Sequence, residues 1–238
     1  MKTINIILVA LLTTISVQAQ WFGNKRVKGN GQLRTIEKTV SAYDDIAVSG
    51  SFDVQLFKGK EGDLTISIEE NLVEYLDISM SGETLSIGWE KGVNISHKKP
   101  IKVRVPVENV KALVLSGSGD ISSDETLTFD DLKLVVTGSG DMNIPLEAKA
   151  LDIKVTGSGD VKVSGSISKG NYVLTGSGSI LSADCKAKDV YTKLSGSGTV
   201  KLCASKNLTA KLTGSGSILY VGKPFFVSFF AENLLKSL

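Results

Sequence analysis

The sequence predicts an all-β protein that forms a right-handed β-helix, or β-solenoid, with Gly-Ser-Gly corners and a less regular β-rich N-terminal part. Three observations predict this fold. A Gly-Ser-Gly triplet occurs six times, at spacings of 21, 19, 19, 20 and 18 residues. Apolar residues stand at every second position around each triplet, which is typical of strands. The same residue types recur in the same columns from repeat to repeat, as in stacked coils, and parallel crossovers favour a right-handed coil.

The composition fits a folded chain and excludes several other classes of protein. Of the 238 residues, 42% are hydrophobic and 22% are charged, which excludes a disordered chain. The 24 glycines follow no every-third-residue period and there are only 4 prolines, which excludes collagen. Because 27 Lys and Arg stand against 25 Asp and Glu, the net charge is +2 and no nucleic-acid partner is expected.

The N-terminus has the pattern of a targeting segment. After Met1-Lys2, an uncharged apolar run from Ile4 to Val17 ends at small residues that suit a signal peptidase. We therefore expect residues 1–19 to be a signal peptide, with an uncleaved anchor as the alternative, and residues 20–33 to be a linker. No later apolar run reaches the ~18 residues that span a membrane, so the mature chain is expected to be exported, to the periplasm or the cell surface.

Residues 34–107 are expected to form irregular coils. Residues 46–56 alternate around Ser49-Gly50-Ser51, which looks like a degenerate corner. Further elements of this part share strand-like alternation or turn residues; they are a strand at 64–68, one helical turn at 71–76, a hairpin at 76–89 that turns at 81–83, and a strand at 101–105 ended by Pro106.

Residues 108–222 are expected to form the regular coils. Each repeat holds one strand that ends at a triplet and another that starts just after it. Glycine suits these corners because it accepts positive φ and lets backbones approach closely. The corner glycines are Gly117, Gly119, Gly138, Gly140, Gly157, Gly159, Gly176, Gly178, Gly196, Gly198, Gly214 and Gly216.

Three aspartates follow the triplets of successive coils and are the weak candidates for a metal site. Stacked coils would place Asp120, Asp141 and Asp160 in one column, where carboxylates repel and Ca²⁺ would relieve the repulsion. Later coils carry Ser or Thr in this column, so a small polar residue that bonds the local turn explains all six positions. We therefore predict no metal and no cofactor.

The two cysteines, Cys185 and Cys203, each lie 11 residues before the next triplet. Their column also holds Leu127, Leu146 and Gly165, so it is expected to face inward. Neighbouring coils would bring the Cα atoms within the range of a disulfide, and a disulfide or a pair of buried free thiols both fit. No catalytic thiol is expected, because the single histidine, His97, lies in a distant loop.

The outward-facing columns and the C-terminus offer surfaces for a partner. Lys154, Lys193 and Lys211 share an outward column with valines of other coils, so part of this face could be covered by another subunit. Residues 223–238 depart from the repeat, because four of the eight phenylalanines fall within residues 225–230. Three interpretations remain open for this atypical aromatic tail: a cap on the last coil, a tail that touches a partner or membrane, and a shifted reading frame.

The stretch from Tyr43 to Val54, together with Leu115-Ser116-Gly117-Ser118-Gly119-Asp120-Ile121 and its repeats, resembles the family of putative auto-transporter adhesins with a head GIN domain. The resemblance covers residues 34–222. It implies a β-helical stack in an exported protein of Gram-negative bacteria of the Bacteroidetes type, with a role in surface adhesion. The family has no catalytic residues to carry over to this chain.

The sequence thus predicts a secreted, non-enzymatic β-solenoid that acts in adhesion or as a scaffold, in the periplasm or at the cell surface. Its partner would be a surface glycan or a protein ligand. The alternative is a carbohydrate-active enzyme or a glycan-binding protein built on a β-helix. A homo-oligomer that pairs through exposed strand edges is a third possibility.

Overall fold

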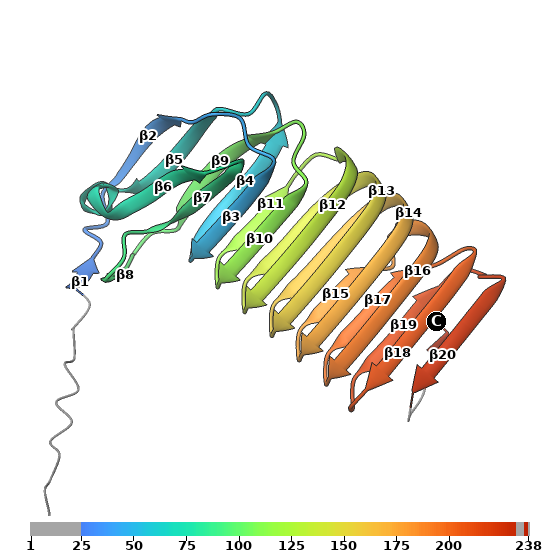
Figure 1. The fold of residues 1–238 in the computed structure, drawn as a ribbon. Helices are drawn as coiled ribbons and strands as arrows, with labels where there is room; N and C mark the ends of the chain where they lie inside the picture. Colours follow the sequence, from blue (N-terminus) through green and yellow to red (C-terminus); the bar gives the residue numbers. More distant parts are fainter. Residues whose placement is uncertain (1–24, 232–235, 238) are drawn as a thin grey trace, which may run out of the picture.

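The computed structural model describes residues 25–231 and 236–237, so the expected signal peptide lies outside the described residues. These residues form a β-solenoid of about six turns, preceded by a less regular β-rich part, as the sequence predicts (Figure 1). The irregular part contains β1 (Lys25–Lys28), β2 (Leu33–Thr39), β3 (Asp45–Gly50), β4 (Phe52–Lys58), β5 (Asp63–Glu69), the 3₁₀ helix η1 (Glu70–Tyr75), β6 (Leu76–Ser81), β7 (Thr84–Trp89), β8 (Val93–Ser96) and β9 (Ile101–Val107).

The regular part follows from residue 112 onward. Its strands are β10 (Ala112–Gly117), β11 (Asp120–Ser123), β12 (Leu127–Gly138), β13 (Asp141–Gly157), β14 (Asp160–Gly176), β15 (Ser179–Ser182), β16 (Cys185–Gly196), β17 (Thr199–Cys203), β18 (Asn207–Thr213), β19 (Ser217–Val221), β20 (Phe226–Ala231) and β21 (Lys236–Ser237). The long strands β12, β13 and β14 bend through more than one side of the coil, so the strand count exceeds the number of turns.

Two long walls meet at the Gly-Ser-Gly corners. The first wall is made of strands that end at a corner, in the order β6–β7–β3–β10–β12–β13–β14–β16–β18–β20. The second wall is made of strands that start after a corner, in the order β2–β5–β9–β4–β11–β13–β14–β15–β17–β19–β21. All pairs between regular coils are parallel and in register. Alternate side chains therefore enter a single hydrophobic core, which runs the length of the stack.

The corner glycines allow the coils to stack this closely. Gly138 has φ +118°, and a Cβ on it would lie 2.5 Å from the carbonyl oxygen of Gly117 in the preceding coil. A Cβ on Gly140 would lie 2.2 Å from the carbonyl oxygen of Gly119, although its φ is not in the left-handed region. The first glycine of a triplet is thus required by its backbone conformation and by contact, and the second by contact alone.

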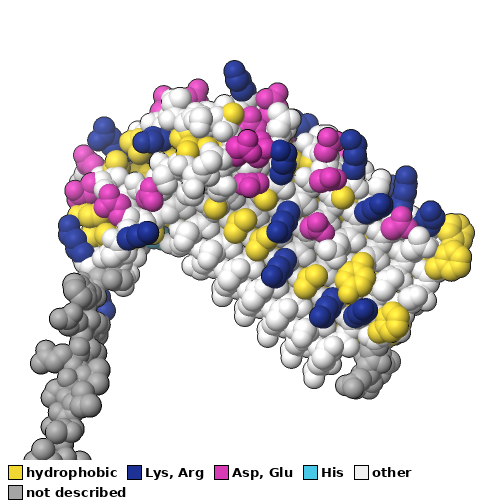
Figure 2. Space-filling model, in the orientation of Figure 1, with side chains coloured by type: hydrophobic (Ala, Val, Ile, Leu, Met, Phe, Trp, Pro, Cys, Tyr) yellow, Lys and Arg dark blue, Asp and Glu magenta, His cyan; other side chains and the backbone are white. Residues whose placement is uncertain are grey.

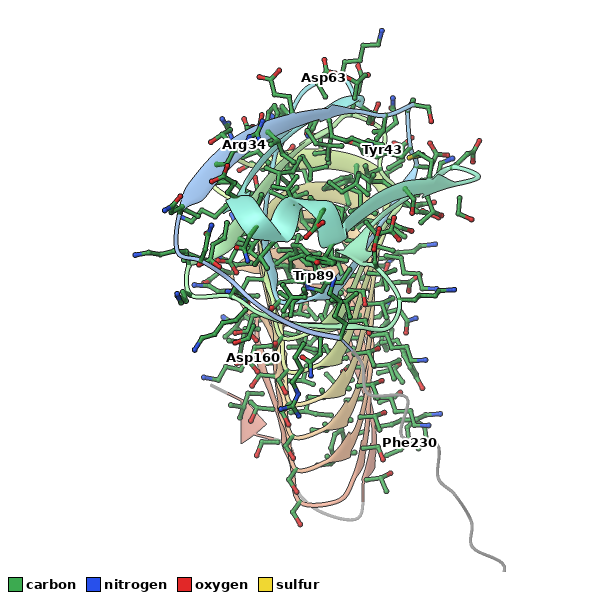
Figure 3. All side chains as sticks on the ribbon, turned by 90° about the vertical axis from the view of Figure 1, so that its left-hand side faces the viewer. Arg34, Tyr43, Asp63, Trp89, Asp160 and Phe230 are labelled. Atoms are coloured by element: carbon green, nitrogen blue, oxygen red, sulfur yellow. The ribbon has the colours of Figure 1, made fainter. Side chains whose placement is uncertain are left out.

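One end of the stack, the closed end, is covered by residues 70–89, which comprise η1 and the β6–β7 hairpin. The core there includes Leu72 of η1 and Phe52, whose ring lies 4.8 Å from the ring of Trp89. Figure 3 looks along the stack from this end, with η1 crossing in front and Trp89 just below it. The helical turn and the hairpin therefore close the core, as the sequence indicated in position if not in role.

The other end, the open end, is formed by β20 and the preceding Phe225. A strand does form here, but β20 continues the first wall in register with β18 instead of folding across the core. Phe225 and Phe226 are 81% and 72% exposed, and Phe230 is also exposed. Among the described residues, the aromatic tail therefore does not bury the last coil, which differs from its interpretation as a cap.

Two expectations about the irregular part need correction. Within the expected linker 20–33, residues 25–28 form β1, which pairs in parallel with β8, so the ordered fold begins before residue 34. Pro106 does not end the preceding strand, because β9 continues to Val107. The carbonyl oxygen of Pro106 accepts a 2.6 Å hydrogen bond from the buried Tyr43 hydroxyl, which holds this edge of the strand in place.

Candidate binding site

The predicted aspartate column exists on the outer face of the second wall. Asp120 pairs with Asp141 in the strand ladder, and the backbone N–H of Asp141 donates to Oδ1 of Asp120 at 3.3 Å. The backbone N–H of Asp160 likewise donates to Oδ1 of Asp141 at 2.8 Å. These carboxylates thus bond the next coil, and no group of three metal-ligating side chains occurs among the described residues.

The column contains a fourth aspartate that the sequence analysis missed. Asp53 pairs with Asp120, and Lys102 of β9 pairs with Asp53 on the other side. The signal was present, because Asp53 follows Gly50 by three residues, just as Asp120 follows Gly117. The corner at Gly50 has Phe52 in place of the second glycine, which hid the correspondence.

A polar groove of about 440 Å³ lies where the second wall meets β2 and β5. Two neighbouring rows of outward side chains cross its five strands. The first row, continued by Thr35 of β2, contains Ser67, Lys102, Asp53 and Asp120. The second row contains Thr65, Arg104, Gln55 and Ser122. The groove is therefore built on strands, which hold side chains more firmly than loops do.

The charges in the groove are unevenly partnered. Burial and the nearby Asp120 carboxylate raise the pKa of Asp53, and Lys102 and His97 partly oppose this. Among the described residues, neither Lys102 nor Arg104 forms an ion pair. The Arg104 guanidinium lies over the Phe57 ring, 4.9 Å from its centroid, in a cation–π contact that orients it. The groove thus combines charged donors and acceptors whose hydrogen-bonding capacity is largely unused.

Next to this groove, Ser51 and the single histidine come together, which the sequence analysis did not foresee. The Ser51 hydroxyl lies 2.9 Å from Nε2 of His97, and Nδ1 of His97 lies 2.9 Å from the carbonyl oxygen of Lys99. The imidazole therefore faces a backbone carbonyl where a catalytic triad has a carboxylate. Ser51 is the middle residue of the degenerate corner, and His97 fastens the loop before β9 to that corner.

The two cysteines do not share one column. Cys185 lies in register with Gly165, as expected, and is buried, whereas Cys203 pairs with Val221 at the end of β17 and is only half-buried. Both are free thiols in the structure. The coil that contains Cys203 is shorter, with a triplet spacing of 18 residues, so counting back from the triplet crosses the missing positions.

The outward column of the first wall is confirmed. It runs in register through Val114, Val135, Lys154, Val173, Lys193, Lys211 and Phe230. Figure 2 shows this face, where hydrophobic and cationic side chains alternate along the coils. A second hollow of about 410 Å³ lies beside this column; it is shallow and flanked by the Asn171–Asp152 hydrogen bond of 2.8 Å.

The comparisons with known proteins agree on the fold. A putative adhesin from Bacteroides fragilis superimposes with a TM-score of 0.82 at 24% identity, covering 89% of this chain and 97% of that one. A protein from Parabacteroides distasonis described as a putative lipid binding protein has a TM-score of 0.73 at 25% identity, covering 90% and 100%. A putative adhesin from Parabacteroides merdae has a TM-score of 0.70 at 23% identity, covering 90% and 99%.

No curated protein sequence matches the chain. The family described as putative auto-transporter adhesin, head GIN domain, matches residues 42–224, which include the degenerate corner, all six triplets and the groove strands β3–β5, β9 and β11. Because this match spans most of the sequence, the chain belongs to the family of putative auto-transporter adhesins with a head GIN domain.

Proposed function

We propose that the protein is a non-catalytic binding protein that acts in adhesion, exported to the periplasm or the cell surface. The observation that carries this proposal is the polar groove, which presents paired donors and acceptors from rigid strands on the outer face of the stack. Membership of an adhesin family and the likeness to proteins of Bacteroides and Parabacteroides support it. Among the described residues, no helix is long and apolar enough to cross a membrane.

The alternative of a carbohydrate-active enzyme has one local observation in its favour, the contact between Ser51 and His97. A nucleophilic serine needs a base that is held by a third group and a set of donors for the developing oxyanion. Here the third group is the Lys99 carbonyl, and the backbone N–H groups of Ser118 and Gly119 already donate to the Gly50 carbonyl. A binding role therefore fits this corner better than catalysis.

The proposal is tested in two steps on the full chain. Cell fractionation combined with protease treatment of intact cells should find the protein outside the cytoplasm, and beads coated with purified protein should adhere to cells or to extracellular matrix more than albumin-coated beads do. Cytoplasmic retention, or adhesion equal to that of albumin beads, would overturn it. An active-site probe for serine hydrolases that labels Ser51 would favour the enzyme.

A second binding mode has its own observation, the exposed phenylalanines of the open end. One structural neighbour is described as a putative lipid binding protein, and exposed aromatic side chains are suited to a lipid–water interface. Co-sedimentation with phosphatidylethanolamine–phosphatidylglycerol vesicles tests this mode. Binding that the double substitution Phe225→Ser and Phe226→Ser abolishes would support lipid contact, and no co-sedimentation would remove it.

A further inference from the structure

We propose that the polar groove binds a neutral, hydroxyl-rich sugar residue of a glycan, an inference that rests on the proposed binding function and names its ligand. The groove, as defined above, lies across β2, β5, β9, β4 and β11. Its volume of about 440 Å³ falls within the range of small-molecule sites, ~300–1,000 Å³.

The strand ladder places a donor beside an acceptor twice in this groove. Lys102 lies in register with Asp53, and Arg104 lies in register with Gln55 two residues further along the same strands. A sugar hydroxyl both donates and accepts one hydrogen bond, so one such pair saturates one hydroxyl: the cation donates to it and the carboxylate or amide oxygen accepts from it. The two pairs therefore suit two hydroxyls of one sugar ring.

Further hydroxyl-binding groups complete the two rows. On the side of β5, Ser67 lies next to Lys102 and Thr65 lies next to Arg104. On the side of β11, Asp120 and Ser122 extend the rows in the same way. A ligand with hydroxyls on several carbons would meet a partner at each position, whereas a lipid tail or an apolar peptide would leave these groups desolvated without hydrogen bonds.

The charge balance favours a neutral ligand over an acidic one. The groove holds the two carboxylates of Asp53 and Asp120 and the two cations of Lys102 and Arg104, so its formal charge is zero. An acidic sugar would bring a third negative charge close to Asp53, whose ionised form is already disfavoured by burial and by Asp120. A neutral hydroxyl that donates to Asp53 would instead stabilise its charged form.

The charges of Lys102 and Arg104 are not used by the protein itself. Neither cation forms an ion pair within residues 25–231, although both lie next to acidic or amide side chains of the same groove. Arg104 is held by Phe57, so its N–H groups are oriented without being consumed. Groups that are oriented but unpaired are suited to a ligand, since little entropy is lost when the ligand binds.

The test uses isothermal titration calorimetry and saturation-transfer NMR on the folded chain with three kinds of trisaccharide probe. The neutral probes are cellotriose, maltotriose and mannotriose, the acidic probe is trigalacturonate, and the cationic probe is chitosan trimer. We expect binding of at least one neutral probe and weaker or no binding of the charged ones. Preference for trigalacturonate or chitosan trimer would overturn the proposal, and so would the absence of binding to all neutral probes.

Matched substitutions locate the site. Lys102→Met and Asp53→Asn should each weaken binding of the neutral probe about tenfold or more, because each removes a hydrogen bond to a charged group. Lys162→Met and Asp141→Asn change the same residue types in the same two rows outside the groove, and should alter affinity less than about twofold. Equal losses in groove and control variants would contradict the assignment, provided that thermal melting shows all four to be folded.

The failure of this inference is distinguishable from failure of the proposed function. If coated beads adhere and the groove variants adhere as well as the wild type, the glycan site is wrong and the adhesion role stands. If the beads do not adhere at all, the adhesion role is wrong whatever the soluble trisaccharides do.

Discussion

The two ends of the stack contain similar residues in opposite environments. At the closed end, Phe52 is fully buried against Trp89, and η1 and the β6–β7 hairpin lie over the core. At the open end, Phe226 and Phe230 stand on the last strand and remain exposed. A phenylalanine therefore closes this fold only when a further element covers it, and the aromatic sequence by itself does not make a cap.

The difference also concerns hydrogen bonds. The first wall ends at the closed end in a hairpin whose two strands pair with each other, so its last strand is short and twisted away. At the open end β20 pairs with β18 on one side, and no described strand pairs with its other side. An apolar edge strand with free N–H and C=O groups is a template for pairing with another chain.

The largest expected effect is at the closed end. Phe52→Ala should lower the free energy of unfolding by about 3–5 kcal/mol, because it leaves a cavity beside Trp89. Phe226→Ala at the open end should change it by less than about 0.5 kcal/mol, because the side chain is already in solvent. Urea unfolding monitored by circular dichroism measures both. Similar losses for the two variants would show that the open end is buried in solution.

The corners between the ends should come next. Gly140→Ala places a Cβ about where the Gly119 carbonyl oxygen stands, so the coils must separate locally, at a cost of about 1–3 kcal/mol. Ser139→Ala in the same corner changes an exposed side chain and should cost less than about 0.5 kcal/mol. Phe52 occupies the equivalent corner position at the closed end, where no coil lies beneath it. Wild-type stability of Gly140→Ala would refute the contact argument.

The open end should also govern self-association. The double substitution Phe226→Lys and Phe230→Lys adds charge to the edge of β20, so it should reduce the association constant measured by analytical ultracentrifugation about tenfold or more. Leu33→Lys is a matched control, because Leu33 is an exposed apolar residue on β2 in the N-terminal part. A monomeric wild type at all concentrations, or an equal effect of the control, would contradict homo-oligomer formation through this edge.

The smallest effect concerns the thiols, of which Cys203 lies one coil nearer the open end. Burial raises the pKa of Cys185 from 9 to about 11, so its thiolate should be about 100-fold scarcer at pH 8 than at an ordinary cysteine. Half-buried Cys203 should therefore react first with Ellman's reagent. Because the protonated form is favoured in the folded state, the contribution of Cys185 to stability is full below pH 9 and falls as pH approaches 11.

The same labelling decides between the two states of the cysteine pair. Free thiols should react without a reductant, in the order Cys203 and then Cys185. A protein that reacts with the reagent only after reduction contains the disulfide instead. Equal labelling rates for the two cysteines at pH 8 would contradict the burial of Cys185. Peptide mass spectrometry after alkylation identifies which cysteine has reacted.

The sequence was sufficient for the periodic features. The triplets give the corners because glycine there is required by sterics, and alternation gives the two walls because each strand buries one face. The column positions of Asp120 and Lys154 follow by counting residues from the nearest triplet. Such counting works wherever consecutive coils have equal length.

Counting fails where coil length changes or where contacts are made between distant strands. Cys203 is misplaced because its coil is shorter, and Asp53 was overlooked because Phe52 replaces the second corner glycine. The groove itself depends on β5 pairing with β9, which adds antiparallel strands to a parallel wall. No local pattern specifies that pairing, just as none indicates that His97 reaches Ser51.

Each corner glycine rests on the backbone of the preceding corner glycine, so the regular coils are interchangeable as building blocks. A chain without residues 139–157, one full period of 19 residues, would join Gly138 to Ser158 and keep every inward-facing position inward. The outer faces would shorten by one strand spacing of about 4.8 Å, while the closed end and the groove stayed intact. Gain or loss of whole coils therefore offers a way to change the reach of such a protein without rebuilding its binding end.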